Sequence, residues 1–110
     1  NNSNEWSVTL LTLGTVSYSD TNLQLILDQP VAGNGLISLA HQLIAAKLNI
    51  TAGASDSAVA NDIEAADALI GGLVVPPVGT GYLSPSTTSG LTKILDDFNS
   101  GVIGPGHCAE

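Results

Sequence analysis

The side chains that could do chemistry are few and lie far apart in the chain. His41 falls within an apolar helical pattern, where a histidine can serve as a general base or a metal ligand. No histidine or carboxylate stands three or four residues from it, so the pattern favours a partly buried histidine that bonds backbone or amide groups. His107, Cys108 and Glu110 offer three kinds of metal ligand, but neighbours on an irregular tail cannot readily enclose one ion.

The acidic residues and serines show no catalytic or metal-binding pattern. Asp62, Glu64 and Asp67, like the pair Asp96-Asp97, are predicted to lie on the solvated faces of helices, outside any alternating calcium-ligand loop. No serine stands in a G-x-S-x-G context, and the Gly-Asn-Gly at residues 33–35 has no third glycine and no nearby cation. We therefore expect a protein that is not an enzyme and has no metal ion and no cofactor.

The net charge of -8 arises from ten acidic residues against Lys47 and Lys93, with no arginine. We expect no nucleic-acid partner, because nucleic acids and anionic membranes need basic side chains to replace counterions. No apolar run approaches the ~20 residues of a membrane span, so no membrane insertion is expected. Only 11% of the residues are charged, and the resulting surface of small polar residues favours a secreted or assembled protein over a cytosolic one.

The element that must position the other segments is an apolar helix at residues 35–50. Its apolar side chains cover more than one face, so it needs neighbours on several sides. We predict one mainly α domain over residues 1–110, a bundle of about four helices organised around this helix. A β-hairpin or extended stretch within residues 1–18, turning at Gly14-Thr15, should come first. The other helices are expected at residues 20–28, 57–71 and 85–100, before an irregular tail at 101–110.

Local patterns also predict helix caps, buried faces and the connection before the last helix. Ser55 or Asp56 should cap the third helix. Residues 73–83 should run as an extended arm, because Pro76-Pro77 forbids a helix there. The third helix is predicted to bury Val59, Ile63, Ala66 and Ile70. The fourth helix is predicted to bury Thr87, Leu91, Ile94, Leu95 and Phe98.

Several residues could engage other molecules. Cys108 is the only cysteine, so it is either a free thiol or half of an intermolecular disulfide. Asn49 and Asn1 satisfy the N-x-[ST] pattern of N-glycosylation. Contacts to partners could come from the apolar arm and from two isolated aromatic residues: Val74, Val75, Pro76, Pro77, Tyr82 and Trp6. The aromatic rings could stack on sugars or could pack in the core or against the hairpin.

Five blocks of sequence carry a family resemblance. They are LTLGTVSY at residues 11–18, GNGLISLAHQLIAAKLN at 33–49, ADALIGGLVVPPVG at 66–79, LSPS at 83–86 and IGPGHC at 103–108. With them the chain resembles a module of unassigned function found in exported and cell-surface proteins of bacteria, often as an accessory segment of a longer chain. The resemblance covers nearly all of the chain and implies a location more than an activity.

The resemblance also bears on the cysteine. In the module, a cysteine-containing segment that ends in a Trp-bearing stretch usually precedes the LTLG block, and Asn4-Glu5-Trp6 looks like its remnant. The upstream cysteine is absent here, which leaves Cys108 without the partner that the resemblance implies.

These observations predict a secreted, non-enzymatic structural module at the bacterial cell surface. We expect it to make protein–protein contacts, either with itself as a filament or surface-layer subunit or with another surface protein. The alternative is an accessory carbohydrate- or protein-binding module of secreted proteins.

Overall fold

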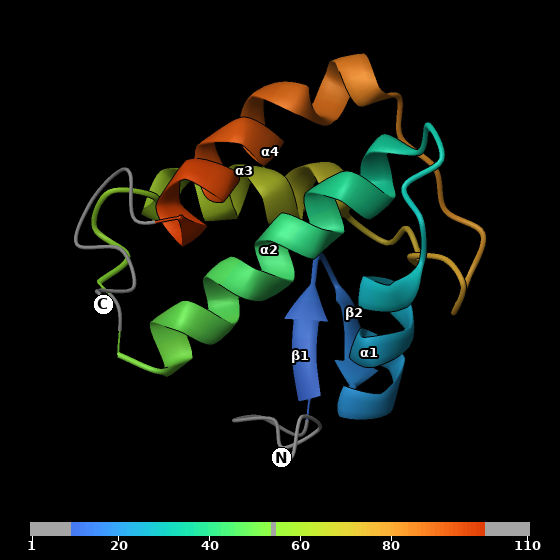
Figure 1. Ribbon diagram of the computed structural model, residues 1–110, viewed down its shortest axis with the longest axis horizontal. Coiled ribbons are helices and arrows are strands. Elements are labelled where there is room, and N and C mark those ends of the chain that lie inside the picture. The colour runs from blue at the N-terminus through green and yellow to red at the C-terminus, as the bar shows by residue number, and fades with distance from the viewer. Residues whose placement is uncertain (1–9, 54, 101–110) are drawn as a thin grey trace.

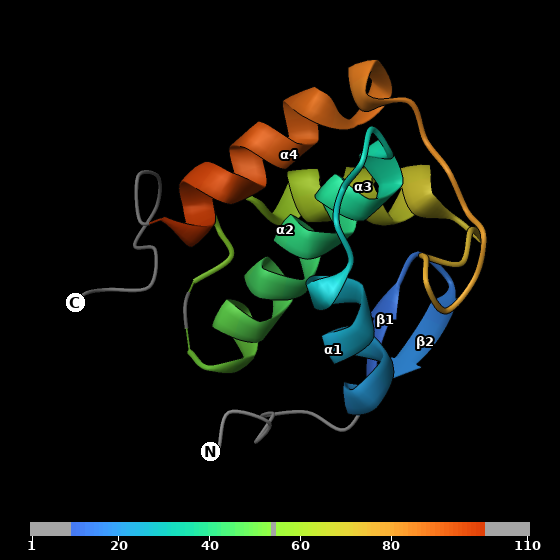
Figure 2. The same ribbon diagram turned by 45° about the vertical axis from the view of Figure 1, so that its right-hand side comes forward.

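The computed structural model describes residues 10–53 and 55–100, and it confirms the predicted mainly helical fold with an N-terminal hairpin. The elements are β1 (Leu10–Leu13), β2 (Val16–Ser19), α1 (Asp20–Asp28), α2 (Gly35–Thr51), α3 (Ala60–Ile70) and α4 (Pro85–Asn99). In Figure 1, α2 crosses the centre with α4 above it and the hairpin below it, and Figure 2 keeps the same order. No helix in the described ranges is long and apolar enough to cross a bilayer.

The hairpin pairs β1 and β2 antiparallel around a two-residue turn at Gly14-Thr15, as predicted. Leu11 lies opposite Tyr18, and both side chains face the core. On the other face, the hydroxyls of the Thr12–Ser17 pair bond each other at 3.1 Å. The alternation of buried and exposed residues therefore sets the register, because a slip of one residue would turn the apolar side chains to solvent.

Helix α2 is the centre of the core, as its apolar pattern predicts. It packs against α1, α3, α4 and β1. Its start is fixed by Asn34, whose Oδ1 accepts the backbone N–H of Leu36 at 2.9 Å as a helix cap. The buried residues of α2 are Gly35, Leu36, Ile37, Leu39, Ala40, Leu43, Ile44 and Ala46.

The close approach of α2 and α4 depends on Gly35. A Cβ at this position would overlap Thr88 Oγ1 and would lie 2.7 Å from the Ser84 carbonyl oxygen. The sequence prediction that Thr87 faces the core is wrong, because Thr87 is exposed and Thr88 is fully buried against α2. The pattern of large apolar residues missed this crossing, where the small side chain of Thr88 fits.

Helix α3 begins at Ala60, later than the predicted residue 57, and neither predicted cap is used. The residue that precedes the helix is Val59, which makes no side-chain capping bond. Its N–H donates to the Asp56 carbonyl at 2.9 Å, so a turn comes before the helix. Burial of Val59 accounts for this, since the turn carries its side chain into the core.

The arm between α3 and α4 is irregular, but it does not stay extended. It turns back at residues 76–79, where the Gly79 N–H donates to the Val75 carbonyl at 3.1 Å and the Gly81 N–H donates to the Val74 carbonyl at 2.8 Å. The buried Val75 N–H donates to the Tyr18 hydroxyl oxygen at 3.0 Å. The arm is therefore fastened to the protein's own hairpin at Val75, one of the residues predicted to be available for contacts with partners.

We predict that Tyr18→Phe destabilises the protein by about 1–3 kcal/mol, because it leaves the buried Val75 N–H without an acceptor. Burial raises the pKa of Tyr18 above its ordinary value of 10.0, and the bond from Val75 only partly opposes this rise. The folded protein thus holds the phenol proton more tightly than the unfolded chain does. The Tyr18 hydroxyl therefore makes its full contribution to the free energy of unfolding below pH 10. That contribution is lost as the pH rises through the pKa of Tyr18 in the folded protein.

Urea unfolding of the wild type and Tyr18→Phe at several pH values from neutrality upward measures both effects. Tyr82→Phe is the matched control, since Tyr82 is 57% exposed, and it should unfold like the wild type. A Tyr18→Phe variant as stable as this control would contradict the role given to the hydroxyl.

Candidate functional site

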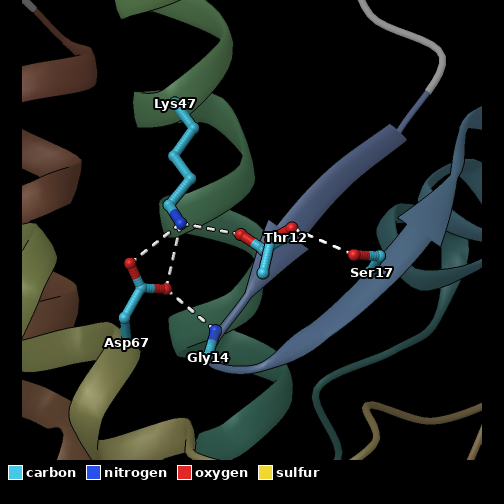
Figure 3. A network of polar contacts seen from close by, with 5 residues as sticks. All are labelled: Thr12, Gly14, Ser17, Lys47 and Asp67. Carbon is cyan, nitrogen blue, oxygen red and sulfur yellow. Dashed lines mark hydrogen bonds and ion pairs between the residues drawn. The ribbon is translucent and has the colours of Figure 1, made fainter.

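A network of polar contacts joins Lys47 on α2 to Asp67 on α3 (Figure 3). The Lys47 ammonium donates to the two carboxylate oxygens of Asp67, at 3.0 and 2.9 Å, and to the Thr12 carbonyl, at 2.7 Å. Asp67 Oδ1 also accepts the backbone N–H of Gly14, at 2.9 Å. The two charged side chains are 19% and 29% exposed, so water screens their attraction only in part. We call this arrangement the Lys47–Asp67 link.

The turn of the hairpin completes the contact with α3. Gly14 has a φ of +65°, and a Cβ there would overlap the backbone carbonyl of Gly71. The Thr15 N–H donates to that carbonyl at 2.9 Å. A glycine is required at the turn because the backbones of the hairpin and the end of α3 come so close.

A groove lies on the same side of the molecule, between β1, the C-terminal half of α2 and the start of α3. Its volume is about 390 Å³. Its walls combine apolar, acidic and lysine side chains: Leu11, Lys47, Ile50, Thr51, Asp56, Ala60, Ile63 and Glu64. The size falls within the range of about 300–1,000 Å³ that is usual for ligand sites in proteins.

His41 has the structural role that its isolation in the sequence predicted. Its Nε2 lies 2.7 Å from the Ile26 carbonyl oxygen near the end of α1. Because a carbonyl oxygen only accepts, this nitrogen carries the proton and donates it. His41 therefore joins α1 to α2.

Within residues 10–53 and 55–100, no group of three His, Cys, Asp or Glu side chains comes close enough together to hold a metal ion. Glu64 and Asp96 are exposed, as expected of a solvated face. The same prediction is wrong for Asp67, which points inward to Lys47 and the hairpin turn. Asp97 makes a surface ion pair with Lys93 at 3.0 Å.

The predicted glycosylation site Asn49 is part of the contact between α2 and α4. Its Nδ2 donates to Asn99 Oδ1 at 3.1 Å, and the Asn99 amide donates in turn to the carbonyl and side-chain oxygens of Gln42, at 3.0 and 2.8 Å. A glycan would attach to the Asn49 nitrogen that makes this bond. Modification there would therefore disturb the packing of the two helices.

The predicted interaction residues of the arm differ in exposure. Val75 is buried, Val74 and Pro76 are half-buried, and Pro77 and Tyr82 are exposed. Only the outer part of the arm is thus available to a partner. The predictions made for Trp6, Asn1, His107, Cys108 and Glu110 lie outside the described residues.

The sequence reasoning missed the Lys47–Asp67 link, the groove and the Tyr18 hydroxyl bond. One signal was available, because Lys47 is the only charged residue in the apolar stretch 33–50. A single lysine in such a helix favours a stem that packs on the core and an ammonium that reaches a partner. Its partners on α3 and β1 depend on the tertiary fold.

Comparisons with protein-family models, with curated proteins and with solved structures found no match. The resemblance drawn from the sequence blocks stays a prediction.

We predict that Asp67→Ala destabilises the protein by about 2 kcal/mol, because it removes an ion pair, leaves the Gly14 N–H without its acceptor and leaves the half-buried Lys47 ammonium with the Thr12 carbonyl alone. Asp97→Ala is the matched control, since it removes the exposed pair with Lys93 and should change stability by less than about 0.5 kcal/mol. Chemical denaturation of both variants measures the difference. Equal effects would show that the link contributes no more than a surface ion pair.

Proposed function

We propose that this chain is a non-enzymatic, extracellular structural module that makes protein–protein contacts and assembles with copies of itself. The contact would use two loops, residues 29–34 between α1 and α2 and residues 71–84 between α3 and α4. The exposed apolar side chains of these loops that are larger than alanine are Pro30, Val31, Pro77, Val78 and Tyr82. We call them the loop surface.

The observation that carries the proposal is the concentration of exposed apolar groups on these loops. Of the five large hydrophobic side chains exposed in the described part of the chain, Val31, Val78 and Tyr82 belong to them, at 36%, 39% and 57% exposure. Exposed apolar groups that gather in one region are typical of contact sites. Aromatic residues such as Tyr82 often supply much of the binding energy in such contacts.

The loop surface has a defined shape because Asn34 joins its two halves. The Asn34 N–H donates to the Val31 carbonyl at 2.9 Å, and its side-chain amide donates to the Gly81 carbonyl at 3.0 Å. Asn34 Oδ1 also accepts the Leu83 N–H at 3.3 Å. A surface fixed in this way loses little conformational entropy when it binds.

Charge supports the use of this surface for contacts between copies. The chain has a net charge of -8, so copies repel each other where their acidic faces meet. Neither residues 29–34 nor residues 71–84 contain a charged side chain. The two loops therefore offer an approach that brings few like charges together.

The loop surface is tested by the double variant Val78→Ser/Tyr82→Ser. We expect the wild type to associate and the variant to associate at least tenfold more weakly, a change of about 1.4 kcal/mol. Leu25→Ser is the matched control, because Leu25 is 48% exposed on α1 and lies outside both loops, and it should associate like the wild type.

Sedimentation velocity with negative-stain electron microscopy measures the assembly, with reductant present so that no disulfide of Cys108 contributes. A wild type that stays monomeric at high concentration would contradict self-association. A double variant that assembles like the wild type would place the contact elsewhere.

The alternative function, an accessory binding module of secreted proteins, is supported by a different observation. The groove beside the Lys47–Asp67 link is large enough for a ligand or a side chain of a partner, and no residue of the loop surface lines it.

A further inference from the structure

The groove beside the Lys47–Asp67 link has an apolar wall and an acidic rim. Leu11 of β1, Ile50 of α2 and Ile63 of α3 supply the apolar side chains. Asp56 and Glu64 both line it and are exposed to solvent. An occupant that matches this groove has an aliphatic part next to a positive charge.

The cation already in the groove does not neutralise the rim. An ammonium group has three protons to donate, and Lys47 uses its donors on Thr12 and on the two oxygens of Asp67. Among the described residues, neither Asp56 nor Glu64 forms an ion pair. The start of α3 offsets about half an elementary charge through the helix dipole. The rim therefore keeps more than one negative charge.

We propose that this groove binds a basic segment of a different protein, whose lysine or arginine side chain enters it. The aliphatic stem packs on Leu11, Ile50 and Ile63, and the cationic group lies between Asp56 and Glu64. Long basic side chains suit such a site because their stems bury on apolar surface while their charged ends stay near solvent. This contact is independent of the self-association proposed for the loop surface.

A second copy of the chain is a poor occupant. The chain has no arginine and only two lysines, of which Lys47 lies in the groove itself. Lys93 is the other, and it is paired with Asp97 beside the exposed Asp96. Docking α4 into the groove would bring these carboxylates towards Asp56 and Glu64. The complementary charge must therefore come from a partner of basic composition.

The test uses the full chain labelled with ¹⁵N and an acetylated seven-residue peptide with a central lysine flanked by valines. We expect saturable shifts of the amide signals of Ile50, Ile63 and Glu64 on titration. Asp56→Asn/Glu64→Gln should weaken binding at least tenfold. Ala60→Leu should also weaken it, because Ala60 is exposed at the groove wall and a larger side chain fills the space without disturbing the core.

Two controls separate the groove from general attraction to an acidic protein. Asp28→Asn/Asp96→Asn changes the net charge by the same two units at exposed positions outside the groove, and it should bind like the wild type. A peptide with norleucine in place of lysine keeps the stem without the charge, and it should bind at least tenfold more weakly.

The proposal would be overturned if the two double variants weakened peptide binding equally, or if the amide shifts were centred on residues outside the groove. It would also be overturned if the norleucine peptide bound as tightly as the lysine peptide, or if the wild type did not bind the lysine peptide. None of these results depends on whether the wild type self-associates. The loop variant Val78→Ser/Tyr82→Ser should bind the peptide as the wild type does.

Discussion

The ion pair between Lys47 and Asp67 is the interaction on which the arrangement of the hairpin depends. A two-stranded hairpin is at best marginally stable alone, so β1 and β2 must be held by the helices. The apolar side chains of their inner face pack on the core. The Lys47–Asp67 link also sets the orientation of the hairpin. Its bonds to the Thr12 carbonyl and the Gly14 N–H fix β1 and the turn against α2 and α3.

Hydrogen bonds between a polar side chain and the backbone of a distant segment also occur elsewhere in the fold. Asn34 fastens the arm, Tyr18 holds Val75, and His41 joins α1 to α2. Each bond satisfies a backbone group while fixing the position of an irregular segment. Two surfaces result from this rigidity: an uncharged apolar one on the loops and an acidic groove on the side of the Lys47–Asp67 link. The two proposals assign these surfaces to different partners, the loop surface to copies of the chain and the groove to another protein.

The sequence predicted those features that depend on local periodicity. The helices, the central position of α2 and the hairpin turn at Gly14-Thr15 all follow from apolar spacing and turn chemistry. It failed where a residue's partner is remote. Asp67 looks like a solvated helix residue until the hairpin, 53 positions away at Gly14, packs on it. Thr88 and the fold-back of the arm were missed for the same reason, since close helix crossing and tertiary bonds decide them. The groove has no local signature, because its residues come from β1, α2, α3 and the connection between the two helices.

Native-state hydrogen exchange of the Gly14 and Thr15 amides would show whether the Lys47–Asp67 link holds the hairpin against the helices. These amides donate to Asp67 and to the Gly71 carbonyl, on an element that does not belong to the hairpin. If the link holds the hairpin in place, both amides exchange slowly, at rates close to those of the buried α2 amides of Leu39 and Leu43. If both amides exchange at the rate of an unstructured peptide while α2 stays protected, the link does not hold the hairpin in place.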